Sequence, residues 1–293
     1  MKQRDRQERE RASSKVDVLN EALPWIHRMA GKTFVIKYGG SAMENPELCR
    51  QVVADIEMLK LLGIRIVLVH GGGKAISAHV KALGLPVTFK GGLRVTDDAT
   101  MEAVREVLVG KVNQDLVWAL NEYGHNAVGI SGADGKTLKA EQIDPELGRV
   151  GRIREVDPSL IETILEDGYI PVVATVGCAP DGFFNINADV AAGKIAEAMG
   201  ADKLIYLTDV DGLYGDVADE DSLIQSLTRS ETHDLLDSGT LDGGMLPKIR
   251  SIAEALDAGV SEVVILNGTF PHSLLLEIFT DAGCGTMFTQ DNA

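Results

Sequence analysis

Cysteine is scarce in this sequence. The three cysteines, Cys49, Cys178 and Cys284, are odd in number, far apart and in no Cys-x-x-Cys pair. This excludes a disulfide framework and favours buried thiols in a reducing compartment. No His-Glu-x-x-His or Cys/His ligand spacing occurs either, so no metal held by protein side chains alone is expected.

Positive charge and long apolar runs are also short. The 28 Lys and Arg against 44 Asp and Glu give a formal net charge of −16, which argues against a nucleic-acid partner. No apolar run approaches the roughly 18–20 residues of a membrane span, and the charged N-terminus lacks the apolar core of a signal peptide. We therefore expect a soluble, cytoplasmic protein with no membrane partner.

Three common nucleotide or nucleophile motifs fail. Ile26 stands where a Walker A loop ending in Gly31-Lys32-Thr33 needs its first glycine. Ile76 occupies the third glycine position of a dinucleotide-binding motif that would begin at Gly71. The stretch 129–133 ends in Ala133 instead of the glycine of a nucleophile elbow. A P-loop ATPase, a nicotinamide dehydrogenase and a serine hydrolase are thereby disfavoured.

What is present is an alternation of strand and helix patterns from Phe34 onward, which predicts an α/β fold with a parallel sheet covered on both faces. We divide the chain into an N-terminal helical arm (1–32) and two lobes (33–177 and 178–293). The predicted strands are 34–38, 64–70, 126–131, 138–143, 149–156, 169–175, 203–208 and 263–266. The predicted helices are 45–62, 75–83, 98–123, 158–166, 188–199, 230–236, 245–256 and 272–279, with a hairpin at 86–97.

Two glycine loops follow predicted strands. Lys37 ends the first strand and is followed by Gly39 and Gly40, whereas residues 71–73 follow the second strand and precede a helix. Consecutive glycines let backbone N–H groups point at an anion, and a helix N-terminus adds favourable potential. Ligands of open α/β sheets bind at the carboxyl ends of strands. The loops therefore predict an anion site, with plain tight turns as the alternative.

Polar residues further along the chain fit the same kind of site. Asn185, Asn187 and Asp189 alternate, and alternate residues of extended chain share a face. For Asp189 an ordinary helix cap is an equal alternative. Residues 207–214 place two aspartates and a glycine after a strand, which suits a nucleotide-facing turn. Lys248 opposes the dipole of the helix that it begins, which indicates an anionic partner.

The ordered set of these motifs resembles the amino acid kinase family from about Phe34 to the end of the chain. The matching stretches are IKYGGSAM, VHGGGKAIS, GGLRVTD, NINADVAAGKIA, LTDVDGLY and GGMLPKI. Each is weak alone, but together and in this order they are specific. The resemblance implies an open αβα sandwich with a mainly parallel sheet, an N-terminal lobe that binds an acyl amino acid and a C-terminal lobe that binds ATP.

The resemblance also implies roles for single residues. Lys37 and Lys248 would flank the transferring phosphoryl group, and Asp189 would orient both lysines. The substrate-binding residues would be Gly40, Gly72, Gly73, Arg94, Asn185 and Asn187. The nucleotide-binding residues would be Gly39, Thr208, Asp209, Tyr214 and Gly244. His70, between the glycines and their strand, is more simply explained as a satisfied histidine than as a catalytic one.

Within the family, the resemblance implies ATP-dependent phosphorylation, with Mg²⁺, of the γ-carboxylate of N-acetyl-L-glutamate in arginine biosynthesis. That carboxylate, with a pKa of about 4.3, is ionised at pH 7 and needs no general base. The alternatives are a kinase for another N-blocked amino acid such as an aminoadipate derivative, and a non-catalytic amino-acid sensor of the same fold.

An amphipathic stretch, Val16–Gly31, precedes the first strand. On its own it predicts a helix packed either on this chain or on another subunit. The resemblance implies an arginine-sensitive enzyme in which such arms join dimers into a hexamer, a trimer of dimers, with L-arginine bound between the arm and the C-terminal lobe. The matching effector residues would be His272, Glu277, Gly283 and Gly285. The alternative is that these four only pack the last helix.

Overall fold

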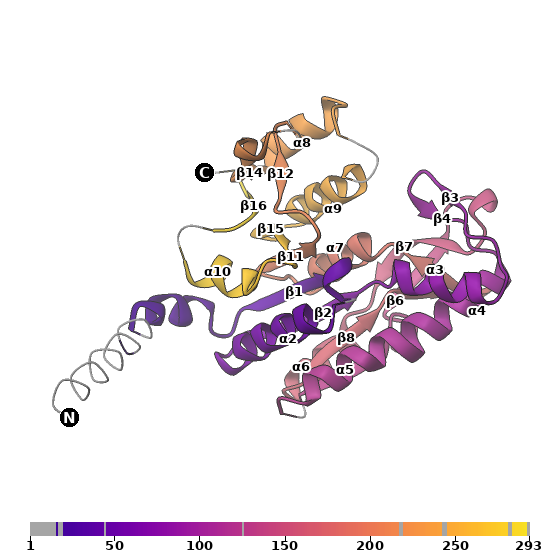
Figure 1. The fold of residues 1–293 in the computed structure, drawn as a ribbon, viewed down its shortest axis with the longest axis horizontal. Coiled ribbons are helices and arrows are strands. Elements are labelled where there is room, and N and C mark those ends of the chain that lie inside the picture. Colours follow the sequence, from indigo (N-terminus) through magenta and orange to yellow (C-terminus); the bar gives the residue numbers. More distant parts are fainter. Residues whose placement is uncertain are drawn as a thin grey trace.

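The computed structural model describes residues 16, 20–43, 45–124, 126–216, 219–241, 245–280 and 283–291. Its centre is an eight-stranded sheet in the order β14-β16-β15-β11-β1-β2-β8-β5 (Figure 1). Every neighbouring pair is parallel except β15 and β16. The strands are β1 (Thr33–Tyr38), β2 (Arg65–His70), β5 (Ala127–Ser131), β8 (Ile170–Ala174), β11 (Lys203–Thr208), β14 (Ser226–Thr228), β15 (Glu262–Asn267) and β16 (Thr286–Thr289).

Helices cover both faces of this sheet, so the predicted α/β fold with a mainly parallel sheet is confirmed. One face packs against α2 (Pro46–Leu61), α3 (Gly73–Ala82), α4 (Asp98–Arg105), α5 (Asn113–Asn121) and α10 (Ser273–Phe279). The other packs against α6 (Ser159–Glu166), α7 (Ala188–Ala198), α8 (Arg229–Asp237) and α9 (Leu246–Asp257).

The alternation of β1 distributes its side chains between the two layers. Phe34 and Ile36 belong to the core cluster on the α2 side, whereas Val35 belongs to the cluster on the α7 side. Successive strand residues point to opposite faces. Lys37 therefore shares the face of Val35 and points toward the layer that contains α7.

A closed four-stranded barrel adjoins the sheet. It consists of β6 (Leu138–Gln142), β7 (Val150–Val156), β9 (Val176–Ala179) and β10 (Gly182–Ile186). The sequence predicts β6 and β7 but not the β9–β10 hairpin. Two further pairs are short: β3 (Phe89–Lys90) with β4 (Leu93–Arg94), which is the predicted hairpin, and β12 (Leu213–Tyr214) with β13 (Leu223–Ile224).

The helix boundaries follow local chemistry closely. The side chain of Asn45 accepts from the N–H groups of Glu47 and Leu48, and Pro46 opens α2, as the sequence predicts. The single long α-helix predicted at 98–123 is wrong over Glu106–Val112, which is a π-helix between α4 and α5. Short 3₁₀ turns lie at Ser41–Met43, Asp134–Lys136, Pro145–Leu147 and Glu220–Ser222.

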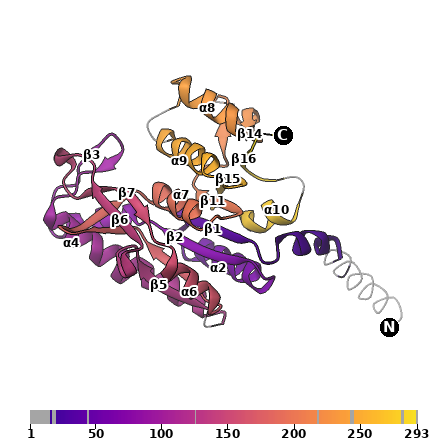
Figure 2. The ribbon, with the colours of Figure 1, turned by 180° about the vertical axis from the view of Figure 1, so that it is seen from behind.

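The predicted arm is described in part. Residues 20–29 form a helix, which lies beside α10 in both views (Figures 1 and 2). Residues 1–15 and 17–19 of the arm fall outside the described residues. The predicted division near residue 177 falls within β9, and the large sheet runs through both parts, so this division stays a prediction. Within the described ranges no helix is both long and apolar enough to cross a membrane.

Candidate active site

The carboxyl ends of three adjacent strands meet at one edge of the sheet. Tyr38 at the end of β1 pairs with His70 at the end of β2, and Lys37 pairs with Tyr206 near the end of β11. Because these strands are parallel, the segments that follow them emerge together. The two glycine loops and the turn that begins at Asp209 are therefore neighbours, as the sequence predicts.

Two lysines converge on one carboxylate at this edge. The Asp189 Oδ1 atom lies 3.1 Å from Lys37 Nζ, and its Oδ2 atom lies 2.8 Å from Lys248 Nζ. The three side chains come from β1, α7 and the first turn of α9. Only 8–17% of each side chain is exposed. The structure thus brings together all three residues that the sequence singles out for catalysis.

The electrostatics of this cluster favour a bound anion. Burial alone would raise the pKa of Asp189, but the charges and hydrogen bonds of the two lysines outweigh it and lower that pKa to about 2. Burial also lowers the pKa of Lys248, with the charge of Lys37 acting in the same direction and Asp189 opposing it. Two ammonium groups on one carboxylate leave a net positive charge in a mostly buried place, which suits phosphate oxygens.

A side chain would be crowded at three glycines of the two loops, whereas Gly73 has open space around it. Gly40 has a φ of +80°, and a Cβ on it would lie 2.3 Å from Asp209 Oδ1. A Cβ on Gly39 would lie 2.9 Å from Lys37 Nζ. A Cβ on Gly72, which caps α3, would lie 2.7 Å from the Leu108 side chain. The first loop therefore packs closely against the Lys37 and Asp209 side chains.

Arg94 contacts the second glycine loop, residues 71–73, and the helix that follows it. Its Nη2 donates to the Gly73 carbonyl at 2.7 Å and to Ser77 Oγ at 2.8 Å, and its guanidinium stacks on Phe89 at 4.8 Å. Burial lowers its pKa. Although the residue is only 7% exposed, Nη1 is buried without a partner. A buried guanidinium nitrogen with no acceptor indicates a place for an anionic ligand.

The two asparagines have different surroundings. The Asn187 side chain caps α7 by accepting from the N–H groups of Asp189 and Val190 at 2.9 and 3.1 Å. Asn185, on β10, donates its amide to Thr96 Oγ1 at 3.2 Å. Asn185 therefore lies near the β4 hairpin that carries Arg94, whereas Asn187 orients the helix turn that presents Asp189.

The predicted nucleotide residues divide between two places. Thr208 ends β11 with its carbonyl bound by the Gly268 N–H at 2.8 Å, and Asp209 touches the Gly40 turn. The Tyr214 hydroxyl donates to Asp211 at 2.9 Å, and both residues line a separate cavity. Gly244 lies outside the described residues.

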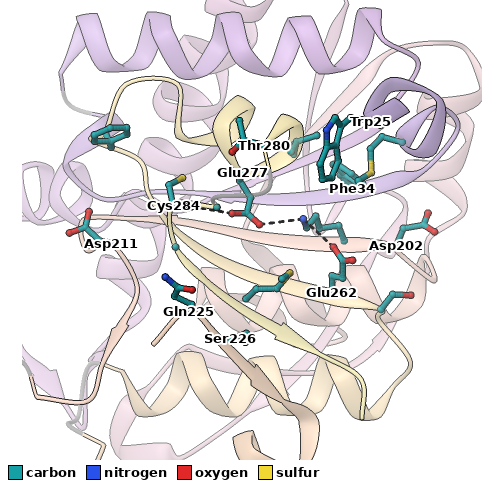
Figure 3. A pocket seen from close by; sticks show the side chains of 18 of the residues that line it. Trp25, Phe34, Asp202, Asp211, Gln225, Ser226, Glu262, Glu277, Thr280 and Cys284 are labelled. Carbon is teal, nitrogen blue, oxygen red and sulfur yellow. Dashed lines mark hydrogen bonds and ion pairs between the residues drawn. The ribbon is translucent and has the colours of Figure 1, made fainter. Parts of the chain in front are cut away.

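That cavity, of about 1010 Å³, extends along the sheet from Lys203 at the amino end of β11 to Asp211 beyond its carboxyl end (Figure 3). Phe34 and Lys203, at the amino ends of β1 and β11, line it together with Trp25 of the N-terminal helix. Lys203 is 4% exposed and ion-pairs with Glu262 at 3.1 Å and with Glu277 at 3.5 Å.

Three of the four predicted effector residues line this cavity. They are Glu277, Gly283 and Gly285. The Glu277 carboxylate also accepts from the Cys284 N–H at 3.4 Å. His272 is not part of the lining; its Nδ1 lies 2.7 Å from Asp55 of α2.

Three residues support these loops: sequence reasoning singled out His70 but missed Asn113 and Ser77. His70 is fully buried, as predicted for a satisfied histidine: its Nε2 lies 3.0 Å from the amide of Asn113, and its Nδ1 lies 3.1 Å from the Gly71 carbonyl. Burial lowers the pKa of His70 to about 4, so the ring is neutral at pH 7. Ser77, which binds Arg94, was also missed, although its position one turn after Gly73 was visible in the sequence.

Known proteins resemble the chain along most of its length. Residues 32–267 match the model of the amino acid kinase family. An acetylglutamate kinase of Caldanaerobacter subterraneus is 50% identical over 280 residues, covering 94% of this chain and 94% of the relative.

Solved structures also resemble the chain over most of its length. N-acetylglutamate synthase from Neisseria gonorrhoeae, complexed with coenzyme A and N-acetyl-glutamate, superposes with a TM-score of 0.83 at 31% identity, over 95% of this chain and 64% of that one. Its complex with coenzyme A and L-arginine gives a TM-score of 0.78 at 28% identity, over 94% and 65%. The synthase thus extends well beyond the part that matches. On this match, made over a sandwich whose glycine loops meet a lysine–aspartate–lysine cluster, the chain belongs to the amino acid kinase family.

Proposed function

We propose that the protein phosphorylates the γ-carboxylate of N-acetyl-L-glutamate with ATP, giving N-acetyl-L-glutamyl 5-phosphate and ADP as a step of arginine biosynthesis. The observation that carries this proposal is Asp189 held between Lys37 and Lys248 beside two glycine loops. The 50% identical acetylglutamate kinase supports the choice of substrate.

In this reaction a carboxylate oxygen attacks the γ-phosphorus, and the bond to the β–γ bridging oxygen breaks with its electron pair passing to ADP. Catalysis consists of alignment and neutralisation of charge on the phosphoryl oxygens. Lys37 and Lys248 supply the cations, and N–H groups of Gly40 and Gly72 supply hydrogen bonds. Asp189 is no base in this scheme: with a pKa of about 2 it stays ionised and keeps the lysines in place.

Mg²⁺ enters this scheme as part of the nucleotide substrate. Within the described ranges no three His, Cys, Asp or Glu side chains are grouped as a metal site. Mg²⁺ commonly binds substrate phosphates and retains several waters, so we assign it to the phosphate oxygens of ATP. Thr208 and Asp209 at the end of β11, with Gly39, are the residues that we assign to the nucleotide side.

The acyl amino acid is assigned to the other side of the cluster. The unpartnered Nη1 of Arg94 would bind the α-carboxylate that does not react, with Gly72, Gly73 and Asn185 beside it. This assigns the N-terminal lobe to the amino acid and the C-terminal lobe to ATP. The capping role of Asn187 supports positioning of Asp189 more directly than contact with substrate.

Trapping with hydroxylamine tests the reaction. An acyl phosphate gives a hydroxamate, whose amount is measured with ATP and one acceptor at a time: N-acetyl-L-glutamate, free glutamate, N-acetyl-aspartate and N-acetyl-aminoadipate. We expect product mainly with N-acetyl-L-glutamate. A preference for the aminoadipate derivative would replace the substrate, and no hydroxamate with any acceptor would reject a kinase in favour of a sensor.

We also propose that L-arginine inhibits the enzyme through the large cavity, and that the N-terminal arms join dimers into a hexamer. Glu277 offers a buried carboxylate for a guanidinium, and the Gly283 and Gly285 turn offers N–H groups for a carboxylate. Trp25 of the N-terminal helix shares the cavity with Glu277. The arginine complex of the 28% identical synthase supports this effector.

A further inference from the structure

A buried tyrosine lies behind the lysine–aspartate cluster, and the proposed reaction leaves it without a role. Tyr206 is a fully buried residue of β11. Its strand partner is Lys37, so both residues belong to the same edge of the sheet. Its ring is close to the second lysine, because Lys248 Nζ lies 5.0 Å from the ring centroid.

The hydroxyl of this tyrosine takes part in a closed triangle of polar contacts. It lies 3.2 Å from the backbone oxygen of Asp189 and 3.0 Å from Ser251 Oγ, and Ser251 Oγ lies 3.1 Å from that same backbone oxygen. Gly193 allows this approach, since a Cβ there would lie 2.5 Å from Ser251 Oγ. The triangle therefore joins the first turn of α7 to α9.

Ser251 follows Lys248 by three residues in α9, so the two side chains share one face of that helix. Fixing Ser251 against the Asp189 backbone consequently fixes Lys248 against the Asp189 carboxylate. The ring adds a second effect, because the negative face of an aromatic ring attracts an ammonium within about 6 Å, and more strongly when both are desolvated.

We propose that Tyr206 is a positioning residue: its hydroxyl and Ser251 clamp α7 to α9, and its ring holds the Lys248 ammonium in place beside Asp189. The inference rests on the proposed function in taking Lys248 as the cation that meets the phosphoryl group.

The groups around Lys248 set its pKa, and this pKa can be measured. Asp189 raises the pKa of Lys248, whereas burial and the charge of Lys37 lower it. Burial raises the pKa of Tyr206 itself, so that residue stays neutral and acts through its ring. Removing the ring removes a contribution that favours the ammonium, so at unchanged burial we expect the pKa of Lys248 to fall.

The experiment compares Tyr206→Phe, which keeps the ring, with Tyr206→Leu and Tyr206→Met, which lose it, and with Ser251→Ala. Phe288→Leu is the matched control, because Phe288 is an equally buried aromatic of the same core cluster on β16. For each variant kcat for N-acetyl-L-glutamate is measured between pH 6 and 10, together with the melting temperature.

We expect the ringless variants to lose about ten-fold in kcat and to show the basic limb of kcat about one pH unit lower. Tyr206→Phe and Ser251→Ala should lose only a few-fold and keep the limb. Ringless variants whose kcat profile matches that of Phe288→Leu would overturn the proposal.

A second measurement does not depend on turnover. The ¹⁵N signal of the Lys248 ammonium, assigned by its absence in Lys248→Met, is titrated in wild type and in Tyr206→Met. A lower pKa in the variant supports the positioning role, and an unchanged pKa overturns it. If the wild type instead forms no hydroxamate, the proposed function fails while this titration still decides the role of Tyr206.

Discussion

At the scale of single residues, the two lysines carry most of the catalytic proposal. Lys248→Met leaves the shape of the side chain but removes one of the two cations that face the phosphoryl group. We expect kcat to fall by at least about 100-fold, the scale for losing one preorganised transition-state donor. The Michaelis constants should change much less, because the lysine acts mainly in the transition state.

Steady-state kinetics with both substrates checks this, and Lys37→Met should behave similarly. Lys194→Met is the matched control, since Lys194 lies on α7 but ion-pairs with Glu197 and Glu254, away from the cluster. A Lys248→Met enzyme with near-normal kcat would reject the assignment.

Arg94 carries the prediction on specificity. Lysine retains the charge but not the planar fork, so Arg94→Lys loses the nitrogen that is free for a ligand. We expect the KM for N-acetyl-L-glutamate to rise about ten-fold or more, with the KM for ATP nearly unchanged. Weaker ATP binding in this variant would show that the two substrate sides have been exchanged.

At the scale of elements, the π-helix Glu106–Val112 and the start of α5 support the glycine loop from behind. Leu108 fills the space beside Gly72, and Asn113 binds the His70 ring and the Val172 carbonyl, the latter at 2.8 Å. π-Helical turns inside helices often occur at functional sites. A change in the conformation of this π-helix would therefore move the glycine loop that we assign to the substrate.

This support predicts a pH dependence of stability. The pKa of His70 is about 4 in the folded protein against 6.5 for an ordinary histidine, so on acidification the unfolded chain takes up the proton first. The stabilisation is complete above pH 6.5 and is lost as the pH falls toward 4. The free energy of unfolding should thereby decrease by about 3 kcal/mol.

Urea unfolding of wild type and His70→Gln at several pH values between 7 and 4 measures this difference. His27→Gln provides the control, because it makes the same replacement at an exposed histidine. Parallel curves for wild type and His70→Gln would mean that the buried ring does not resist protonation.

Sequence patterns were sufficient for the elements with strong local signals. Asn45-Pro46 marks the start of α2. The short apolar run 64–70 predicts a buried strand, which is β2 in the structure. The β9–β10 hairpin was missed because its strands are short and hold Gly177 and Gly182, although the Asp181-Gly182 pair is a hairpin signal. The π-helix has no local signature, because its residues suit an α-helix equally well.

The residues of the candidate site also fall into two groups, those with a signal in the sequence and those without one. The glycine loop after β1 drew attention to Lys37, and the resemblance to the amino acid kinase family assigned Lys37, Asp189 and Lys248 to one site. Tyr206 and Asn113 could not be found, since a buried tyrosine or asparagine acquires its partners only from residues far away in the sequence. Tyr214 was assigned to a turn from its neighbours, while its side chain lines a different cavity.

At the scale of the whole molecule, the amino ends of β1 and β11 line the large cavity, whereas the lysine–aspartate cluster lies toward their carboxyl ends. Phe34 lines the large cavity, and Lys37 follows three residues later, about 10 Å along the strand. If the N-terminal arm completes the effector site and joins dimers, removing it must affect both properties together.

We therefore expect deletion of residues 1–30 to reduce the hexamer to dimers and to weaken inhibition by L-arginine at least ten-fold, the change that losing about 1.4 kcal/mol of binding produces. Basal activity should remain. Light scattering gives the mass, and hydroxamate formation against arginine concentration gives the inhibition. A truncated enzyme that is still hexameric, with its arginine response unchanged, would refute both proposals.

A point variant separates the two properties. Glu277→Gln removes the buried carboxylate but leaves the arm intact, so arginine inhibition should weaken while the mass stays that of the wild type. Equal inhibition of Glu277→Gln and wild type would place the effector elsewhere.

The alternation of β1 also limits how the gene can vary. Phe34 and Lys37 face opposite layers, so inserting or deleting one codon between them would turn the lysine toward α2 and leave Asp189 with a single cation. Two extra codons would restore the face but move the ammonium about 6–7 Å along the strand. The number of residues between Phe34 and Lys37 is therefore fixed by the positions of the two helix layers.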